Sequence, residues 1–143
     1  MIPSLFSDAA IYNDLIRLIA KQRYGIERGD LLKQSKLASG GRFNQRMKEL
    51  EEAGFVVNFK PYGHVARGNY YRIIDEYCYF YLKWIEAVKH TLIMQEKNNK
   101  YWSSKANSPE FYNWMGYAFE AICYKHIREI RNALDINPGA MVG

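Results

Sequence analysis

The feature that most limits the possible folds of this chain is a pair of strand-like segments separated by a turn-rich segment. Residues 55–60 and 70–74 are rich in aromatic and β-branched side chains, which favour strands. The segment between them includes Pro61, Gly63 and Gly68, which favour a loop. The sequence therefore predicts a β-hairpin with a long tip, and other elements of the chain must cover its apolar face.

Three helical segments precede this hairpin. The first begins after Asp8, whose side chain is suited to cap a helix, and ends before Gly25. Its apolar positions recur at helical spacing: Ile11, Leu15, Leu18 and Ile19. The second is a shorter amphipathic segment, residues 27–37, whose apolar positions are Leu31, Leu32 and Leu37.

The third helix has a narrow apolar stripe. We expect Ser39 to cap its start and Gly54 to end it. Its apolar residues are spaced i, i+4 and i+7 and share one face: Phe43, Met47 and Leu50. Three helices followed by a hairpin are the order of elements in a winged helix-turn-helix domain. The predicted fold class is mainly α with a small β-hairpin wing, a winged helix-turn-helix over residues 1–75 followed by long helices.

The character of the sequence changes after residue 75. Residues 76–97 predict an aromatic-rich connecting helix with five aromatic residues between positions 77 and 84. We expect its aromatic face to cover the winged-helix core or to join that core to the next element: Tyr77, Phe80, Tyr81 and Trp84. Residues 98–109 are polar and predict a linker that ends in a Ser-Pro helix start at Ser108.

Residues 110–143 predict a final amphipathic helix. Its apolar face is broad and holds Phe119, Ile122, Cys123, Ile127, Ile130 and Leu134. A single amphipathic helix cannot bury its own apolar face. We therefore expect it to dock on the aromatic helix, to form an oligomer, or to begin a domain that continues beyond the chain.

The charge of the chain is unevenly divided. The whole sequence has a net charge of +5. Residues 1–74 hold 12 Lys and Arg against 7 Asp and Glu, whereas residues 75–143 hold 8 of each. All the excess positive charge lies in the first part, as expected of a domain that binds a polyanion such as double-stranded DNA. An ordinary basic surface exposed to solvent would have the same composition.

Predicted DNA contacts fall in two places. The start of the third helix combines open backbone N–H groups with side chains that suit bases and phosphates. The residues there are Ser39, Gly40, Gly41, Arg42, Asn44, Gln45, Arg46 and Lys48. The hairpin tip adds Lys60, His64 and Arg67. The end of the third helix carries Glu49, Glu51 and Glu52, which phosphates would repel, so only its first two turns suit DNA.

The sequence indicates neither a metal site nor a catalytic site. Cys78 and Cys123 lie in apolar helical patterns, which is typical of buried thiols in a reducing compartment. His64, His90 and His126 have no partner at metal-ligand spacing, and no local pattern suggests a catalytic triad. We therefore expect no metal, no cofactor and no catalytic residue. No segment predicts a membrane span or a signal peptide, so we expect a cytoplasmic protein.

Three segments resemble the C-terminal part of AAA-related prokaryotic ATPases of the archaeal type. They cover residues 29–56, 70–86 and 114–136. The most specific positions are Ile74, Asp75, Glu76, Tyr77, Phe80, Tyr81, Trp114, Gly116, Phe119 and Glu120. The resemblance implies a winged helix that follows a P-loop ATPase module and precedes a domain like restriction endonucleases.

The chain departs from that family in two ways. It has no G-x-x-x-x-G-K-[ST] motif, so no phosphate cradle for ATP is present. In the resemblance, Glu120 corresponds to an acidic residue on the first helix of the nuclease-like domain. The later Asp and Glu-x-Lys needed to hold Mg²⁺ are absent, so residues 110–143 resemble only the truncated start of that domain. We therefore expect a non-catalytic C-terminal fragment of an ATPase.

Two functions remain open on the sequence. The first is a DNA-binding or targeting module built on the winged helix. The second is a protein interaction or coupling element, in which the winged helix packs on an ATPase module or associates with another copy. The aromatic helix over residues 76–95 and the apolar final helix favour the second function, in which the acidic end of the third helix is part of the contact.

Overall fold

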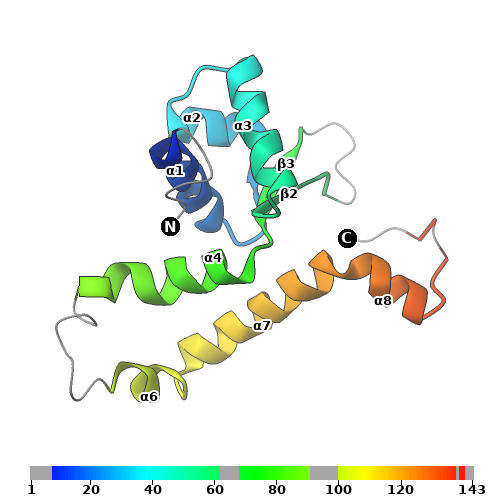
Figure 1. The fold of residues 1–143 in the computed structure, drawn as a ribbon. Helices are drawn as coiled ribbons and strands as arrows, with labels where there is room; N and C mark the ends of the chain where they lie inside the picture. Colours follow the sequence, from blue (N-terminus) through cyan, green and yellow to red (C-terminus); the bar gives the residue numbers. More distant parts are fainter. Residues whose placement is uncertain (1–7, 62–67, 91–99, 138, 141–143) are drawn as a thin grey trace.

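The computed structural model describes residues 8–61, 68–90, 100–137 and 139–140 (Figure 1). Three helices and a small sheet form an N-terminal part, and further helices lie below it in the view of Figure 1. The N-terminal elements are α1 (Ala9–Ala20), β1 (Ile26–Glu27), α2 (Arg28–Ser35), α3 (Gly41–Glu52), β2 (Val56–Phe59) and β3 (Tyr70–Ile73). The described chain is mainly helical with a small antiparallel sheet, as the sequence predicts.

The sheet has one strand more than the sequence predicts. β3 lies in the middle and pairs antiparallel with β2 on one side and β1 on the other. The hairpin register places Val56 opposite Ile73, and β1 places Ile26 opposite Tyr71. β1 has only two residues, too few for a strand pattern to show in the sequence. Gly25, with φ of 91°, turns the chain into this strand.

The core of the N-terminal part lies between α1, α2, α3 and the sheet. The predicted α3 stripe is buried in full: Phe43, Met47 and Leu50. The buried residues of α1 are Tyr12, Leu15, Ile16 and Ile19. Ile11 and Leu18, which the sequence also places on that face, pack only partly against the core. The buried face of α1 is therefore rotated slightly from the predicted one.

Local hydrogen bonds fix the ends of two helices. The Glu27 carboxylate accepts hydrogen bonds from two backbone N–H groups in the first turn of α2, at 2.6 and 3.2 Å. Gly54 ends α3 as predicted, with φ of 75°. The Phe55 N–H then donates to the Leu50 carbonyl at 3.0 Å, as in helices that end in a left-handed residue.

The C-terminal elements are α4 (Glu76–Phe80), η1 (Tyr81–Ile85), η2 (Glu86–Val88), α6 (Tyr101–Lys105), α7 (Pro109–Lys125) and α8 (Ile127–Ala133). The predicted connecting helix is not uniform, because η1 is a π-helical turn and η2 a 3₁₀ turn. Its residues 91–97 lie outside the described residues. The predicted linker contains the short helix α6, and the predicted final helix is divided at His126. The Ser108 side chain caps α7 by accepting a hydrogen bond from the Phe111 N–H.

Aromatic side chains hold α4, η1 and α7 together. Trp114 of α7 lies against Tyr79 and Trp84, with ring centroids 5.9 Å apart in both pairs. Phe80 stacks on Trp102 of α6 at 5.2 Å. Phe80 and Trp84 thus pack on the next elements, α6 and α7, and neither belongs to the N-terminal core.

The expected packing of the aromatic face is wrong for Tyr77, which is 64% exposed and stacks on Tyr81. Cys78 of α4 is buried in the N-terminal core, and Tyr79 packs against that core. Successive residues of a helix point about 100° apart, so burial of Cys78 turns Tyr77 toward solvent.

Ion pairs connect the two parts of the molecule. Arg17 of α1 donates from Nε and Nη2 to Glu86 Oε1, at 3.0 and 2.9 Å. Arg72 of β3 lies 3.2 Å from the Glu120 carboxylate of α7. The residue that resembles a nuclease acid therefore binds an arginine of the sheet. No helix within the described residues combines the length and the apolar character needed to cross a bilayer.

Candidate nucleic-acid interface

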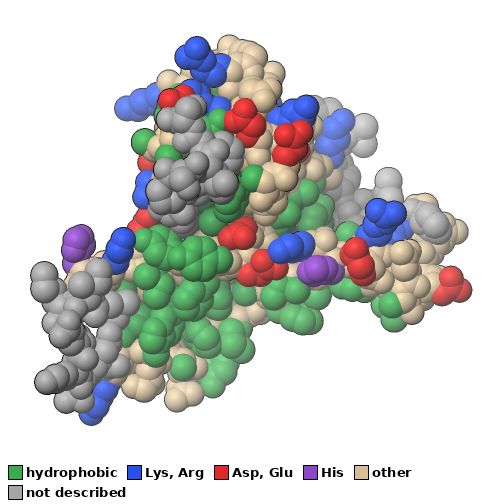
Figure 2. Space-filling view, viewed as in Figure 1, with side chains coloured by type: hydrophobic (Ala, Val, Ile, Leu, Met, Phe, Trp, Pro, Cys, Tyr) green, Lys and Arg blue, Asp and Glu red, His purple; other side chains and the backbone are tan. Residues whose placement is uncertain are grey.

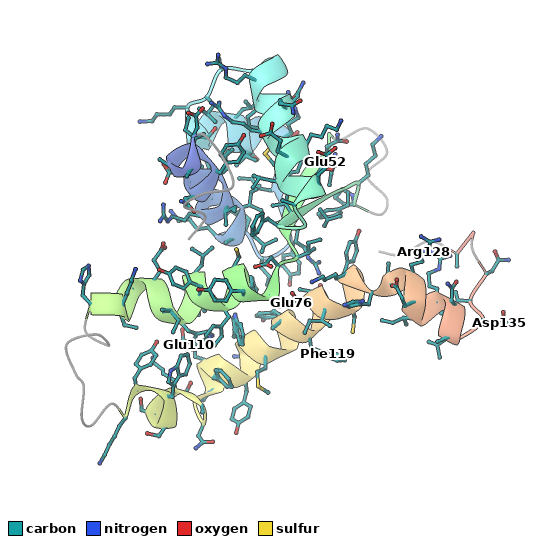
Figure 3. All side chains as sticks on the ribbon, viewed as in Figure 1. Glu52, Glu76, Glu110, Phe119, Arg128 and Asp135 are labelled. Atoms are coloured by element: carbon teal, nitrogen blue, oxygen red, sulfur yellow. The ribbon has the colours of Figure 1, made fainter. Side chains whose placement is uncertain are left out.

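α3 presents one polar face to solvent. In Figure 1 it begins at the top of the N-terminal part, at the end away from α4 and α7. Arg42, Asn44, Gln45 and Lys48 are exposed along its first two turns, opposite the buried stripe. These are four of the side chains that the sequence predicts to contact DNA. Glu52 lies at the other end of α3 (Figure 3).

Arg46 is not part of this face, and its predicted DNA contact is wrong. Its exposed fraction is only 8%, and its Nη2 donates to Asp8 Oδ2 at 3.0 Å. Arg46 lies three residues after Phe43 and one before Met47, so it borders the buried stripe. The guanidinium joins α3 to the start of α1 and is unavailable to a ligand.

The start of α3 differs from the prediction by one residue. Gly40 occupies the N-cap position and no side chain caps the helix, so the predicted cap at Ser39 is wrong. A Cβ atom placed on Gly40 or Gly41 would have nothing within 4 Å. The first turn of α3 is consequently open to solvent.

Neighbouring groups restrain the exposed side chains. Arg28 Nη2 donates to Asn44 Oδ1 at 2.8 Å, and the Arg28 guanidinium lies 5.3 Å from the centre of the Phe43 ring. Gln45 Nε2 donates to Glu49 Oε1 at 2.9 Å. Arg28 is a residue that sequence reasoning missed, because only the fold brings α2 next to α3.

The charge of α3 changes sign along its length. Lys48 lies 3.5 Å from Glu52, and both side chains are largely exposed. A hydrogen bond from Tyr12 and another from Gln45 lower the pKa of the Glu49 carboxyl, so Glu49 stays ionised. Arg42, by contrast, has no ion pair within the described part of the chain. The first turns are therefore cationic and the last turns anionic, as the sequence predicts.

Two further cations lie near the start of α3. Lys33 and Lys36 are exposed at the end of α2 and in the turn that follows it. Lys36 has a left-handed backbone, with φ of 56°, which bends the chain toward α3. Figure 2 shows Lys and Arg side chains at the top of the molecule, where the α2–α3 turn lies in Figure 1. The sequence predicts a helix over residues 27–37 but does not predict a DNA contact for these two lysines.

The hairpin tip is described only in part. Lys60, just after β2, is exposed. The other two predicted tip contacts, His64 and Arg67, lie outside the described residues. The strands that lead to the tip pair as predicted, with Phe59 opposite Tyr70 at the last step before it.

The described side chains form no metal centre. No group of three His, Cys, Asp or Glu residues in residues 8–61, 68–90, 100–137 and 139–140 is placed to hold an ion. Cys78 is buried, which raises the pKa of its thiol to about 12, and Cys123 is partly buried. Neither is paired in a disulfide.

Comparisons of the chain with protein-family models, with curated proteins and with solved structures found no match.

Proposed function

We propose that the N-terminal part is a winged-helix DNA-binding domain with α3 as its recognition helix. The observation that carries the proposal is the row of exposed polar side chains on the first two turns of α3: Arg42, Asn44, Gln45 and Lys48. Support also comes from the order α1, β1, α2, α3, β2, β3, which is that of a winged helix. The net charge of +5 over residues 1–74 favours a polyanion.

In this proposal α3 enters the major groove by its first turns. Arg42 has the fork geometry that pairs with a guanine edge, and Gln45 has the amide that pairs with adenine. Arg28 holds Asn44 in place, so Asn44 contacts the duplex with little loss of side-chain freedom on binding. The carboxylates of Glu49 and Glu52 stay outside the groove, because phosphates would repel them.

The cations around α3 position the protein on the backbone. Lys33, Lys36 and Lys48 suit phosphate contacts, since lysine acts as a flexible point charge. About three such contacts predict a slope near −3 for log affinity against log salt, at about −0.9 per phosphate. Binding of this kind is strongest at low salt and has modest sequence preference.

Fluorescence anisotropy with a labelled duplex tests the proposal. We expect saturable binding at low salt, and Arg42→Ala should weaken it by roughly fivefold or more, the loss expected for one base-edge contact. Arg128→Ala is the matched control, because Arg128 is an exposed arginine on α8, far from α3 (Figure 3). Absence of binding at low salt, or an equal loss in both variants, would contradict the proposal.

Association with a protein partner is a second candidate function. Four apolar side chains of α7 remain in solvent although the helix is docked: Tyr112, Met115, Phe119 and Ile122. By resemblance the natural context is an ATPase, to which such a face would couple the DNA-binding domain. These four side chains do not suit DNA, because none of them carries a positive charge to pair with phosphates.

A further inference from the structure

A hollow lies where the end of α1 meets α4, η1 and α7. Two adjoining cavities, of about 310 and 340 Å³, open there and share five lining residues: Ala20, Lys21, Tyr79, Lys83 and Trp114. Cavities that hold small ligands begin at roughly 300 Å³ and occur preferentially where two parts of a protein meet. This α1–α7 hollow has both properties, because its lining comes from the N-terminal part and from the C-terminal helices.

Aromatic rings form one wall of the α1–α7 hollow. Trp114 stacks on Tyr79, with ring centroids 5.9 Å apart and ring planes 20° apart. Trp114 also contacts Trp84 and Phe111, with centroids 5.9 and 5.8 Å away. Packing on several sides holds the Trp114 ring in one position, so the wall is formed before any ligand binds. An aromatic or flat apolar group suits such a wall.

Charged side chains surround the α1–α7 hollow, and positive charge is in excess. Four cations and two carboxylates line it, which gives a net charge of +2: Arg17, Lys21, Arg23, Lys83, Glu86 and Glu110. Both carboxylates are already paired, Glu86 with Arg17 and Glu110 with Lys83. One carboxylate and one amine bond to these groups from outside the lining and cancel each other: Asp14 and Lys105.

Lys21 and Arg23 carry the excess charge. Neither forms an ion pair within the described part of the chain, and both are exposed. The Arg23 guanidinium lies 3.4 Å from the centre of the Tyr117 ring. This contact occupies one face of the guanidinium and leaves the N–H groups at its edge available to an anion. Lys21 lines both cavities, so its ammonium group lies beside the aromatic wall.

We propose that the α1–α7 hollow binds a small aromatic anion, an aromatic carboxylate or phosphate ester. The ring of the ligand packs against Trp114 and Tyr79, and its charged group accepts hydrogen bonds from Lys21 and Arg23. The excess positive charge repels a cation and gives an uncharged ring no advantage. This site is separate from the proposed DNA contacts, because α3 begins at the end of the N-terminal part away from α4 and α7 (Figure 1).

NMR titration of the isotope-labelled full chain tests the proposal with three probes: naphthoate, naphthyl phosphate and the uncharged naphthylmethanol. We expect at least one anion to move the indole N–H signal of Trp114, which lines both cavities. That anion should bind roughly tenfold or more tightly than the alcohol, as expected for hydrogen bonds to charged groups. Trp102 lines neither cavity, so its signal is the internal reference. The tighter of the two anions identifies the charged group of the ligand.

Lys21→Gln should weaken binding of the anion roughly fivefold or more, the loss expected for one charged hydrogen bond, and leave the alcohol unaffected. Arg128→Gln is the matched control, because Arg128 is an exposed cation on α8 at the far end of the C-terminal helices from Glu110 (Figure 3). Phe119→Gln is a second control, because Phe119 is 68% exposed on α7 and lines neither cavity. Both controls should bind the anion as the native chain does.

A Trp114 signal that neither anion moves would overturn the proposal. Equal affinity for the anions and the alcohol would also overturn it, since the hollow would then be only an apolar crevice. The same holds for an affinity that Lys21→Gln leaves unchanged. Loss of binding in Phe119→Gln would place the probe on the outer side of α7 instead. The proposed DNA contacts of α3 are measured with a duplex, so their test is independent of these results.

Discussion

Arg46 and Asp8 form an ion pair that joins the middle of α3 to the start of α1. The Nη2 and Oδ2 atoms lie 3.0 Å apart, with 9% of the arginine side chain exposed against 54% of the aspartate. A guanidinium that is almost fully buried must keep its partner, because an unpaired buried charge is costly. The ion pair therefore stabilises the fold, and Arg46 does not contact a ligand.

Arg46→Ala should lower the free energy of unfolding by about 1–3 kcal/mol, through loss of the ion pair and of the packed side-chain stem. Asp8 is half exposed, so the lower part of this range is expected. Urea denaturation followed by circular dichroism measures the change. Arg42→Ala, an exposed neighbour on the same helix, should leave stability within about 0.5 kcal/mol. Equal stability of the two variants would show that the ion pair contributes nothing.

Substitution of three glycines by alanine should give a graded loss of stability. Gly25→Ala should cost most, about 3 kcal/mol, because φ is 91° and the new Cβ would lie 3.0 Å from the Tyr71 carbonyl oxygen. Gly54→Ala should cost about 1–2 kcal/mol, since φ is 75° but the space is open. Gly40→Ala should cost least, because its backbone is extended and nothing lies within 4 Å. Thermal unfolding of the three variants checks this order, and a largest loss at Gly40 would contradict it.

The features that the sequence predicts well are local ones. The α3 stripe and its end at Gly54 depend on residues within four positions of one another, and both are found as predicted. The two hairpin strands are likewise identified by their own composition. Their pairing follows from the short distance between them along the chain.

The features that the sequence misses depend on distant contacts. The sequence predicts a DNA contact for Arg46 because arginine pairs well with base edges and phosphates and lies in the first two turns of the helix, but the side chain is buried and pairs with Asp8, 38 positions away. β1 exists only because Ile26 and Glu27 meet β3. The role of Arg28 beside Asn44 likewise needs the α2–α3 angle, which the turn at Lys36 fixes.

The two cysteines should differ strongly in reactivity. Cys78 is 1% exposed, and burial together with the nearby Asp75 carboxylate raises the pKa of its thiol to about 12. The reactive thiolate of Cys78 is then on the order of 1,000-fold rarer at pH 8 than for a thiol with the ordinary pKa. Cys123 is partly exposed on α7. Titration with a thiol reagent should therefore label one cysteine quickly in the native chain and both in urea.

Cys123→Ser is the control for this titration and should abolish the fast phase. If the fast phase persists in that variant, Cys78 is accessible to the reagent and is not buried between α4 and the N-terminal core. Cys78→Ser should keep the fast phase but lower stability, because a hydroxyl would be buried among apolar side chains.

Low pH should weaken the packing of α7 on α4 and η1, because two carboxylates at this contact become protonated. A hydrogen bond from Lys125 lowers the pKa of Glu76, and one from Lys83 lowers the pKa of Glu110. A carboxyl whose pKa is lower in the folded state stabilises the fold above its ordinary pKa. That stabilisation is lost as the pH falls from the ordinary value of 4.5 through the lowered one. The contact of α7 with α4 and η1 should therefore weaken below pH 4.5. The hydrogen bond from Tyr12 of α1 to Glu49 of α3 should weaken over the same range, because the pKa of Glu49 is also lowered.

Intrinsic fluorescence measures this change selectively, because all three tryptophans lie at the contact between η1, α6 and α7: Trp84, Trp102 and Trp114. Their emission should shift to the red below pH 4.5, before circular dichroism reports loss of the helices. In a variant with both Glu76→Gln and Glu110→Gln the shift should be absent, because neither position titrates. Glu52→Gln is the control, since Glu52 lies on α3 and its loss leaves the α4–α7 ion pairs intact. A red shift of the same size in the double variant would show that other groups control the docking of α7.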